Sequence, residues 1–221
     1  MKIAFFGDSV TEGCFEIIRI NGQLEVIRDY PNCFRTLVEN KLRQFYPNKE
    51  FEFFNFGFSG RDTSGAIEVV PEIISKNADL VIMCFGLNDF ANQNVELFKS
   101  NLSSIYERFI AKNIKVVFMT HNMVNKYVNN EEPVELKEFA STCASLQNSG
   151  GVDLFVEAEK EIAAKYNVPV IDAYAKWKEL ESYGIDTSLL LCNYINHPTR
   201  KMHYLFANMI CSFLEKNKYV D

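Results

Sequence analysis

The chain has 221 residues, 48% of them apolar, and 23 basic against 29 acidic side chains give a formal net charge of −6. This length suits one well-buried domain and is short for two, so we expect a single domain over residues 1–221. No Lys/Arg block and no membrane-length apolar run occurs, which argues against nucleic-acid and membrane partners and favours a small neutral or cationic ligand.

The first half of the chain alternates short apolar runs with amphipathic segments. Lys2 to Phe6 predicts a buried strand ending at Gly7, where the missing Cβ permits a sharp turn. Alternating apolar residues around Asn21-Gly22 predict a hairpin between residues 14 and 28. The spacing further on predicts a helix from Asp29 to Pro47, a strand over 51–56, a helix over 63–76 and a central strand over 79–85.

The second half continues the alternation after one irregular stretch. Residues 120–151 are expected to form a loop-rich excursion with a short helix near 136–146, a place where substrate contacts often lie. The regular elements are predicted as helices over 95–112, 152–166, 172–182 and 198–216, and strands over 115–119 and 168–171. Such alternation predicts an α/β fold, a three-layer α/β/α sandwich around a mostly parallel sheet.

Polar residues gather at one edge of this predicted sheet. Ser9 follows the first strand, Gly60 the second and Asn88 the third, while His197 precedes the last helix. Acyl transfer needs a hydroxyl nucleophile, an imidazole that accepts its proton, and N–H donors for the developing oxyanion. This edge supplies all three kinds of group.

Four short blocks at this edge match a known family in order. They are Gly7-Asp8-Ser9, Gly57-Phe58-Ser59-Gly60, Gly86-Leu87-Asn88-Asp89 and His197-Pro198. The chain resembles the SGNH, or GDSL-like, hydrolases over nearly its whole length. The resemblance implies a flavodoxin-like sheet of five parallel strands, no metal and no cofactor. It also implies Ser9 as nucleophile, His197 as general base, and an oxyanion hole from the Ser9 amide, the Gly60 amide and the Asn88 side chain.

The sequence departs from the family near the histidine. Members usually carry an aspartate three or four residues before it, where this chain has Tyr194 and Asn193. An asparagine oxygen that accepts from the imidazole would keep the useful tautomer but lacks the charge that stabilises imidazolium. We therefore predict a Ser9–His197 dyad supported by Asn193 or by a backbone carbonyl.

Three further residues are candidates for substrate binding: Arg61, Asp8 and Asp89. Arg61 directly follows the predicted oxyanion-hole glycine, where its guanidinium can receive a carboxylate or sugar hydroxyls; the alternative is a salt bridge to Asp62 or Glu12. Asp8 is expected to bond loop amides rather than to share the proton chemistry. For Asp89, the alternative to substrate binding is a helix cap.

Together these features predict a serine esterase acting on a small ester, with an acetylated sugar as one option. The alternatives are an acyltransferase to a sugar hydroxyl and a non-catalytic binding module with a degenerate triad. The N-terminus shows no cleavage-site pattern, so a cytoplasmic location is the default, and a homodimer stays open. His121, at the same edge, is either a substrate contact or an ordinary loop histidine.

Overall fold

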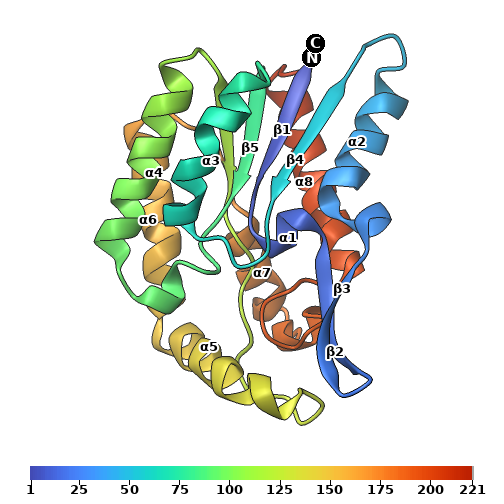
Figure 1. Cartoon of the computed structure of the whole chain (residues 1–221), viewed down its shortest axis with the longest axis vertical. Coiled ribbons are helices and arrows are strands. Elements are labelled where there is room, and N and C mark those ends of the chain that lie inside the picture. Colours follow the sequence, from blue (N-terminus) through green and yellow to red (C-terminus); the bar gives the residue numbers. More distant parts are fainter. Residues whose placement is uncertain (221) are drawn as a thin grey trace.

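The computed structural model describes residues 1–220 and contains a parallel sheet of five strands in the order β4-β1-β5-β6-β7 (Figure 1). Neighbouring strands pair in parallel, with Ile3 opposite both Phe53 and Leu80. The strands are β1 (Lys2–Gly7), β4 (Glu52–Gly57), β5 (Leu80–Cys84), β6 (Lys115–Met119) and β7 (Val170–Ile171). The predicted fold class is confirmed.

Helices cover both faces of the sheet: α3, α4 and α6 lie on one side and α2 and α8 on the other (Figure 1). Among the described residues, no helix combines the length and apolar character needed to cross a membrane. The helices are α1 (Ser9–Glu12), α2 (Phe34–Phe45), α3 (Thr63–Ser75), α4 (Val95–Ile110), α5 (Lys137–Ser149), α6 (Gly151–Lys165), α7 (Ala173–Ser182) and α8 (Arg200–Lys216), with short 3₁₀ turns at Tyr30–Asn32, Phe90–Asn92, Val134–Leu136 and Thr187–Leu190.

The core lies in two layers, one on each face of the central strands. Side chains along a strand point alternately to its two faces, so β1 serves both layers. Phe5 packs edge-on against Phe34 of α2, and Phe6 packs against Phe109 of α4 on the opposite face. Both phenylalanines of β1 are fully buried. This double burial explains why residues 3–6 of β1 and all of β5 are apolar.

The predicted hairpin forms outside the main sheet. Strands β2 (Cys14–Ile20) and β3 (Gln23–Arg28) pair only with each other in an antiparallel ribbon. Asn21 and Gly22 at its tip both have positive φ, 51° and 83°, as a tight hairpin turn requires. The hairpin and α5 extend past the carboxyl ends of the strands, so both border the edge that carries Ser9 (Figure 1).

Two helices begin later than the sequence predicts. Asp29 caps a 3₁₀ turn rather than the following helix, and α2 starts after Cys33. Helix α8 starts at Arg200, with Thr199 as its cap, because Pro198 instead forms a bridge with Leu191. The second difference matters for the site, since it leaves residue 197 in a loop that faces the sheet edge.

Candidate active site

Ser9 lies at a sharp turn between β1 and α1. A Cβ on Gly7 would come within 2.2 Å of Thr11 Oγ1, so only glycine allows the chain to fold back so closely here. Asp8 then caps α1, and its Oδ1 accepts the amide of Val10 at 2.9 Å. These local contacts place Ser9 at the first position of the helix with only 4% of its surface exposed.

His197 contacts Ser9 and a backbone carbonyl at the same time. Its Nε2 is 3.0 Å from Ser9 Oγ, and its Nδ1 is 2.7 Å from the carbonyl oxygen of Phe15. A carbonyl can only accept a hydrogen bond, so Nδ1 must carry the proton. The bare Nε2 is therefore free to accept the hydroxyl proton of Ser9, which is the tautomer that base catalysis needs.

Burial keeps the imidazole neutral at neutral pH. Loss of hydration lowers the pKa of His197 below its ordinary value of 6.5, while the Phe15 carbonyl and the charges of Glu12 and Glu16 act in the opposite direction. The residue is 5% exposed. A neutral, buried imidazole beside a hydroxyl is ready to act as a general base.

Asn193 does not take the place of the usual aspartate. Its Oδ1 accepts the backbone amides of Ile195, Asn196 and His197 at 3.1, 3.0 and 2.8 Å. Its Nδ2 donates to Asn196 Oδ1 at 2.9 Å. The side chain thus shapes the loop before α8 and does not contact the imidazole. Its assignment as a catalytic residue is corrected, and the carbonyl of Phe15 occupies that position.

The loops after β4 and β5 meet beside the end of β1. The amide of Phe58 donates to the Gly7 carbonyl at 3.1 Å, which ties the β4 loop to the start of the nucleophile turn. Gly60 has φ 78°, and no atom lies within 4 Å of the position a Cβ would take. Asn88 Nδ2 donates one hydrogen to the Arg61 carbonyl at 3.0 Å, which leaves its second hydrogen for another acceptor. These groups remain the candidate oxyanion-hole donors.

Comparison with protein families identifies the chain. The model of the GDSL-like Lipase/Acylhydrolase family matches residues 5–205. The chain belongs to this family. It is an ester-hydrolysing serine hydrolase. A comparison with curated proteins gives no match.

Solved structures of the GDSL type share the fold at low sequence identity. The acetyl xylan esterase AlAXEase superposes with a TM-score of 0.71 and 16% identity, over 97% of this chain and 100% of the other. A lipase/acylhydrolase from Enterococcus faecalis gives 0.71 and 21% over 98% and 96%. A catalytic mutant of an acetylxylan esterase from Geobacillus stearothermophilus gives 0.69 and 17% over 96% and 92%. The order of strands and helices is therefore that of this hydrolase fold.

Arg61 follows Gly60 in the loop after β4, and within residues 1–220 it forms no salt bridge. Its Nη1 donates to the Phe56 carbonyl at 2.8 Å, and its guanidinium carbon is 4.9 Å from the centre of the Phe58 ring. Among the described residues, neither Asp62 nor Glu12 forms an ion pair with it. Burial lowers its pKa, although the group stays charged at neutral pH. Binding of a substrate carboxylate or hydroxyl by Arg61 stays a prediction.

Asp8 and Asp89 are buried carboxyl groups that hold the backbone around the site. Asp8 has no exposed surface and Asp89 has 6%. Oδ1 of Asp89 accepts the amide of Thr63 at 2.9 Å and its hydroxyl at 2.5 Å, which fixes the start of α3. Burial raises the pKa of Asp8 to about 7 and that of Asp89 to about 6. Substrate binding by either carboxyl group stays a prediction.

A buried pair behind the site was missed at the sequence level. Glu159 is fully buried, and its Oε1 is 3.6 Å from Nε2 of His121. Burial raises the pKa of Glu159 well above its ordinary value and lowers that of His121 to about 4, so the buried surroundings disfavour the charged form of both groups. Helical spacing could have revealed the burial of Glu159, because this residue lies on the apolar face of α6 with Phe155 and Ile162.

The pair also explains why residue 86 is a glycine. This residue has φ 123°, and a Cβ there would lie 2.3 Å from His121 Cδ2 and 2.5 Å from Glu159 Oε1. His121 is therefore a packing residue, the ordinary alternative for this loop histidine. Within residues 1–220, no three His, Cys, Asp or Glu side chains are grouped so that they hold a metal ion.

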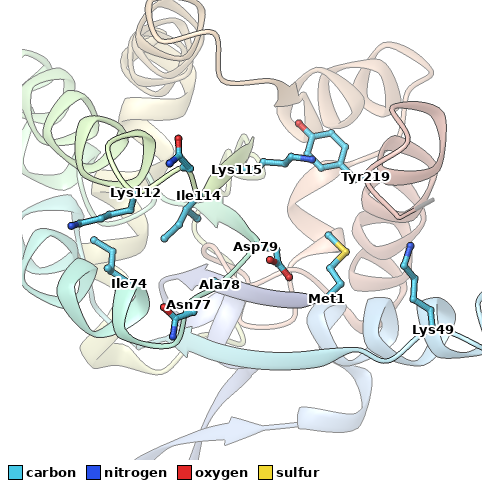
Figure 2. Close-up of a pocket in the computed structure, with 11 residues that line it drawn as sticks. Met1, Lys49, Ile74, Asn77, Ala78, Asp79, Lys112, Ile114, Lys115 and Tyr219 are labelled. Atoms are coloured by element: carbon cyan, nitrogen blue, oxygen red, sulfur yellow. The ribbon is translucent and has the colours of Figure 1, made fainter.

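A separate hollow of about 610 Å³ lies at the opposite edge of the sheet (Figure 2). Its lining includes Met1 and Asp79, which precede β1 and β5, together with Lys115 and Tyr219. None of the candidate catalytic residues borders it. The hollow is therefore not part of the candidate active site.

Proposed function

We propose that this chain hydrolyses a small carboxylic ester through an acyl-enzyme formed on Ser9. The observation that carries the proposal is the position of His197 between its two partners. Nε2 lies 3.0 Å from Ser9 Oγ, and Nδ1 lies 2.7 Å from the Phe15 carbonyl. Base, nucleophile and orienting acceptor are thus aligned in the manner of a serine-hydrolase triad, with a carbonyl as third member.

In the first step, Ser9 Oγ attacks the ester carbonyl while its proton passes to His197 Nε2. The oxyanion is held by N–H donors from the Ser9 amide, the Gly60 amide and the Asn88 side chain. Collapse of the tetrahedral intermediate breaks the C–O bond, and imidazolium returns the proton to the leaving alcohol. Water then attacks acyl-Ser9 with the same base, which releases the carboxylic acid and restores the hydroxyl.

The burial of the dyad favours a small acyl group. Ser9 and His197 are only 4% and 5% exposed, so little space adjoins the nucleophile. Phe58, at the rim, is 60% exposed and offers an aromatic face beside the Arg61 guanidinium. An apolar ring face next to N–H donors suits a sugar, which carries C–H faces and hydroxyl edges. The acetylxylan esterases among the structural neighbours support the same choice, an acetylated carbohydrate.

The test compares p-nitrophenyl acetate, butyrate and octanoate, and then an acetylated xylooligosaccharide with acetate release as readout. We expect kcat/KM to fall as the acyl chain lengthens, and turnover to disappear in Ser9→Ala and persist in Ser149→Ala, an exposed control. A preference for octanoate would contradict the small-acyl assignment. No turnover of any ester by the native protein would leave the binding module as the better account.

A further inference from the structure

The carbonyl that orients His197 belongs to an irregular part of the hairpin. The β2–β3 pairing shifts register between Cys14 and Ile17, so Phe15 and Glu16 lie in a bulge. A bulge leaves backbone groups outside the ladder and redirects them. The Phe15 carbonyl is thereby free to accept from His197. Because of this irregularity, strand pairing alone does not fix the position of the Phe15 carbonyl.

The side chain of Phe15 is held between two residues of α8. The Arg200 guanidinium carbon lies 4.5 Å from the centre of the Phe15 ring, and the centre of the His203 ring lies 4.6 Å from it. His203 is in turn fixed, because its Nδ1 accepts the amide of Phe34 at 3.0 Å. Phe15 and His203 are both fully buried. Rotation of the Phe15 ring would therefore disturb several fixed neighbours.

Arg200 also bonds carboxylate side chains at the base of both hairpin strands. Its Nη1 and Nη2 donate to the two carboxylate oxygens of Glu16 at 2.5 and 3.2 Å, and its Nε donates to Asp29 Oδ2 at 2.5 Å. Glu16 directly follows Phe15, and Asp29 follows the last residue of β3. The two carboxylates raise the pKa of Arg200, as a bidentate guanidinium pair does. One side chain from the first turn of α8 thus anchors both strands at the base of the hairpin.

We propose that Arg200 is a positioning residue that keeps the Phe15 carbonyl on Nδ1 of His197. The proposal rests on the function assigned above to Ser9 and His197. A neutral carbonyl orients the ring only while its own backbone stays in place, and a displacement of about 1 Å in such a group costs about 100-fold in rate. The anchor from Arg200 supplies this constraint through packing and charge pairing.

The first test measures kcat and KM for p-nitrophenyl acetate in Arg200→Ala, Arg200→Lys and the control Arg108→Ala. We expect kcat to fall by about 10- to 100-fold in Arg200→Ala with KM changed less than about 2-fold, because transition-state alignment is lost rather than binding. Added guanidinium chloride at low concentration should restore part of the rate. Arg200→Lys should lose most of the rate as well, since an ammonium cannot bond both carboxylates and lacks the planar face. Arg108, which donates to the Ile67 carbonyl, lies outside this network.

The second test follows the imidazole itself by NMR of protein labelled with ¹⁵N-histidine. The chain has only three histidines, so the Nδ1 proton of His197 can be assigned with a His197→Ala spectrum. We expect this resonance to shift or broaden in Arg200→Ala and to be unchanged in Arg108→Ala. The melting temperature is recorded for each variant, and kinetics are measured well below it.

The outcomes separate the two claims. Unchanged kcat and an unchanged Nδ1 resonance in folded Arg200→Ala would overturn the positioning role, even if the melting temperature fell. An inactive native protein would instead contradict the proposed esterase function, and the NMR experiment would still decide whether Arg200 orients His197.

Discussion

Asp8→Asn tests whether the carboxyl group next to the nucleophile is protonated in the folded protein. Asp8 is fully buried, and burial raises its pKa from 3.8 to about 7. The folded state therefore binds a proton that the unfolded chain releases between these two pH values, so this group lowers stability as pH rises. At about 1.4 kcal/mol per pH unit, the native protein should lose about 4 kcal/mol of unfolding free energy from this group between pH 4 and pH 8.

Asparagine cannot ionise, so the unfolding free energy of the variant should not include this pH-dependent decrease. The free energy of unfolding of Asp8→Asn minus that of the native protein should rise by about 4 kcal/mol from pH 4 to pH 8, whatever the difference is at pH 4. Urea unfolding followed by fluorescence of the single tryptophan, Trp177, measures this difference. Asp186→Asn is the matched control, because Asp186 caps a turn through the amide two residues on, as Asp8 does, but is exposed. A pH-independent difference for Asp8→Asn would refute the reasoning.

Three further predictions concern the site and its support. The acid limb of kcat/KM should have a midpoint below pH 6.5, because His197 acts as a base only when deprotonated and burial lowers its pKa; a midpoint above 6.5 would contradict this. Gly86→Ala should destabilise the protein by about 3 kcal/mol or more in urea unfolding, because the added Cβ meets His121. Gly22→Ala should cost about 1 kcal/mol, because the added Cβ there points into open space. Asn193→Asp should not raise kcat, because its side chain contacts backbone amides and not the imidazole; a clear gain would place that side chain at the ring.

The sequence predicted the fold well because its signals are local. Apolar runs with helical or strand spacing identify the elements, and the Asn21-Gly22 pair correctly located the hairpin turn. The start of α8 was less accurate because Pro198 suits the first turn of a helix but here forms a bridge with Leu191. That choice depends on contacts across the fold, which no local pattern records.

The candidate site was predictable where residue type decides chemistry. Ser9 and His197 were found from their blocks, and the structure places them within hydrogen-bonding distance. A backbone carbonyl was one of the two predicted partners for the imidazole, but the residue that supplies it was not predicted. Any residue can offer a carbonyl, and the bulge that exposes the Phe15 oxygen arises from hairpin register. Asn193 was misassigned for a related reason: an asparagine near a histidine has the right chemistry, but its side chain bonds the backbone of its own loop.

The most direct test of the central claim is covalent labelling of the folded native protein with a fluorophosphonate. An activated serine attacks phosphorus and displaces fluoride, which leaves a stable phosphonyl ester that mass spectrometry of peptides can locate. We predict labelling on Ser9, none in Ser9→Ala, and a strongly reduced rate in His197→Ala. A native protein that stays unlabelled, or that is labelled at another residue, would contradict the assignment of Ser9 as the nucleophile.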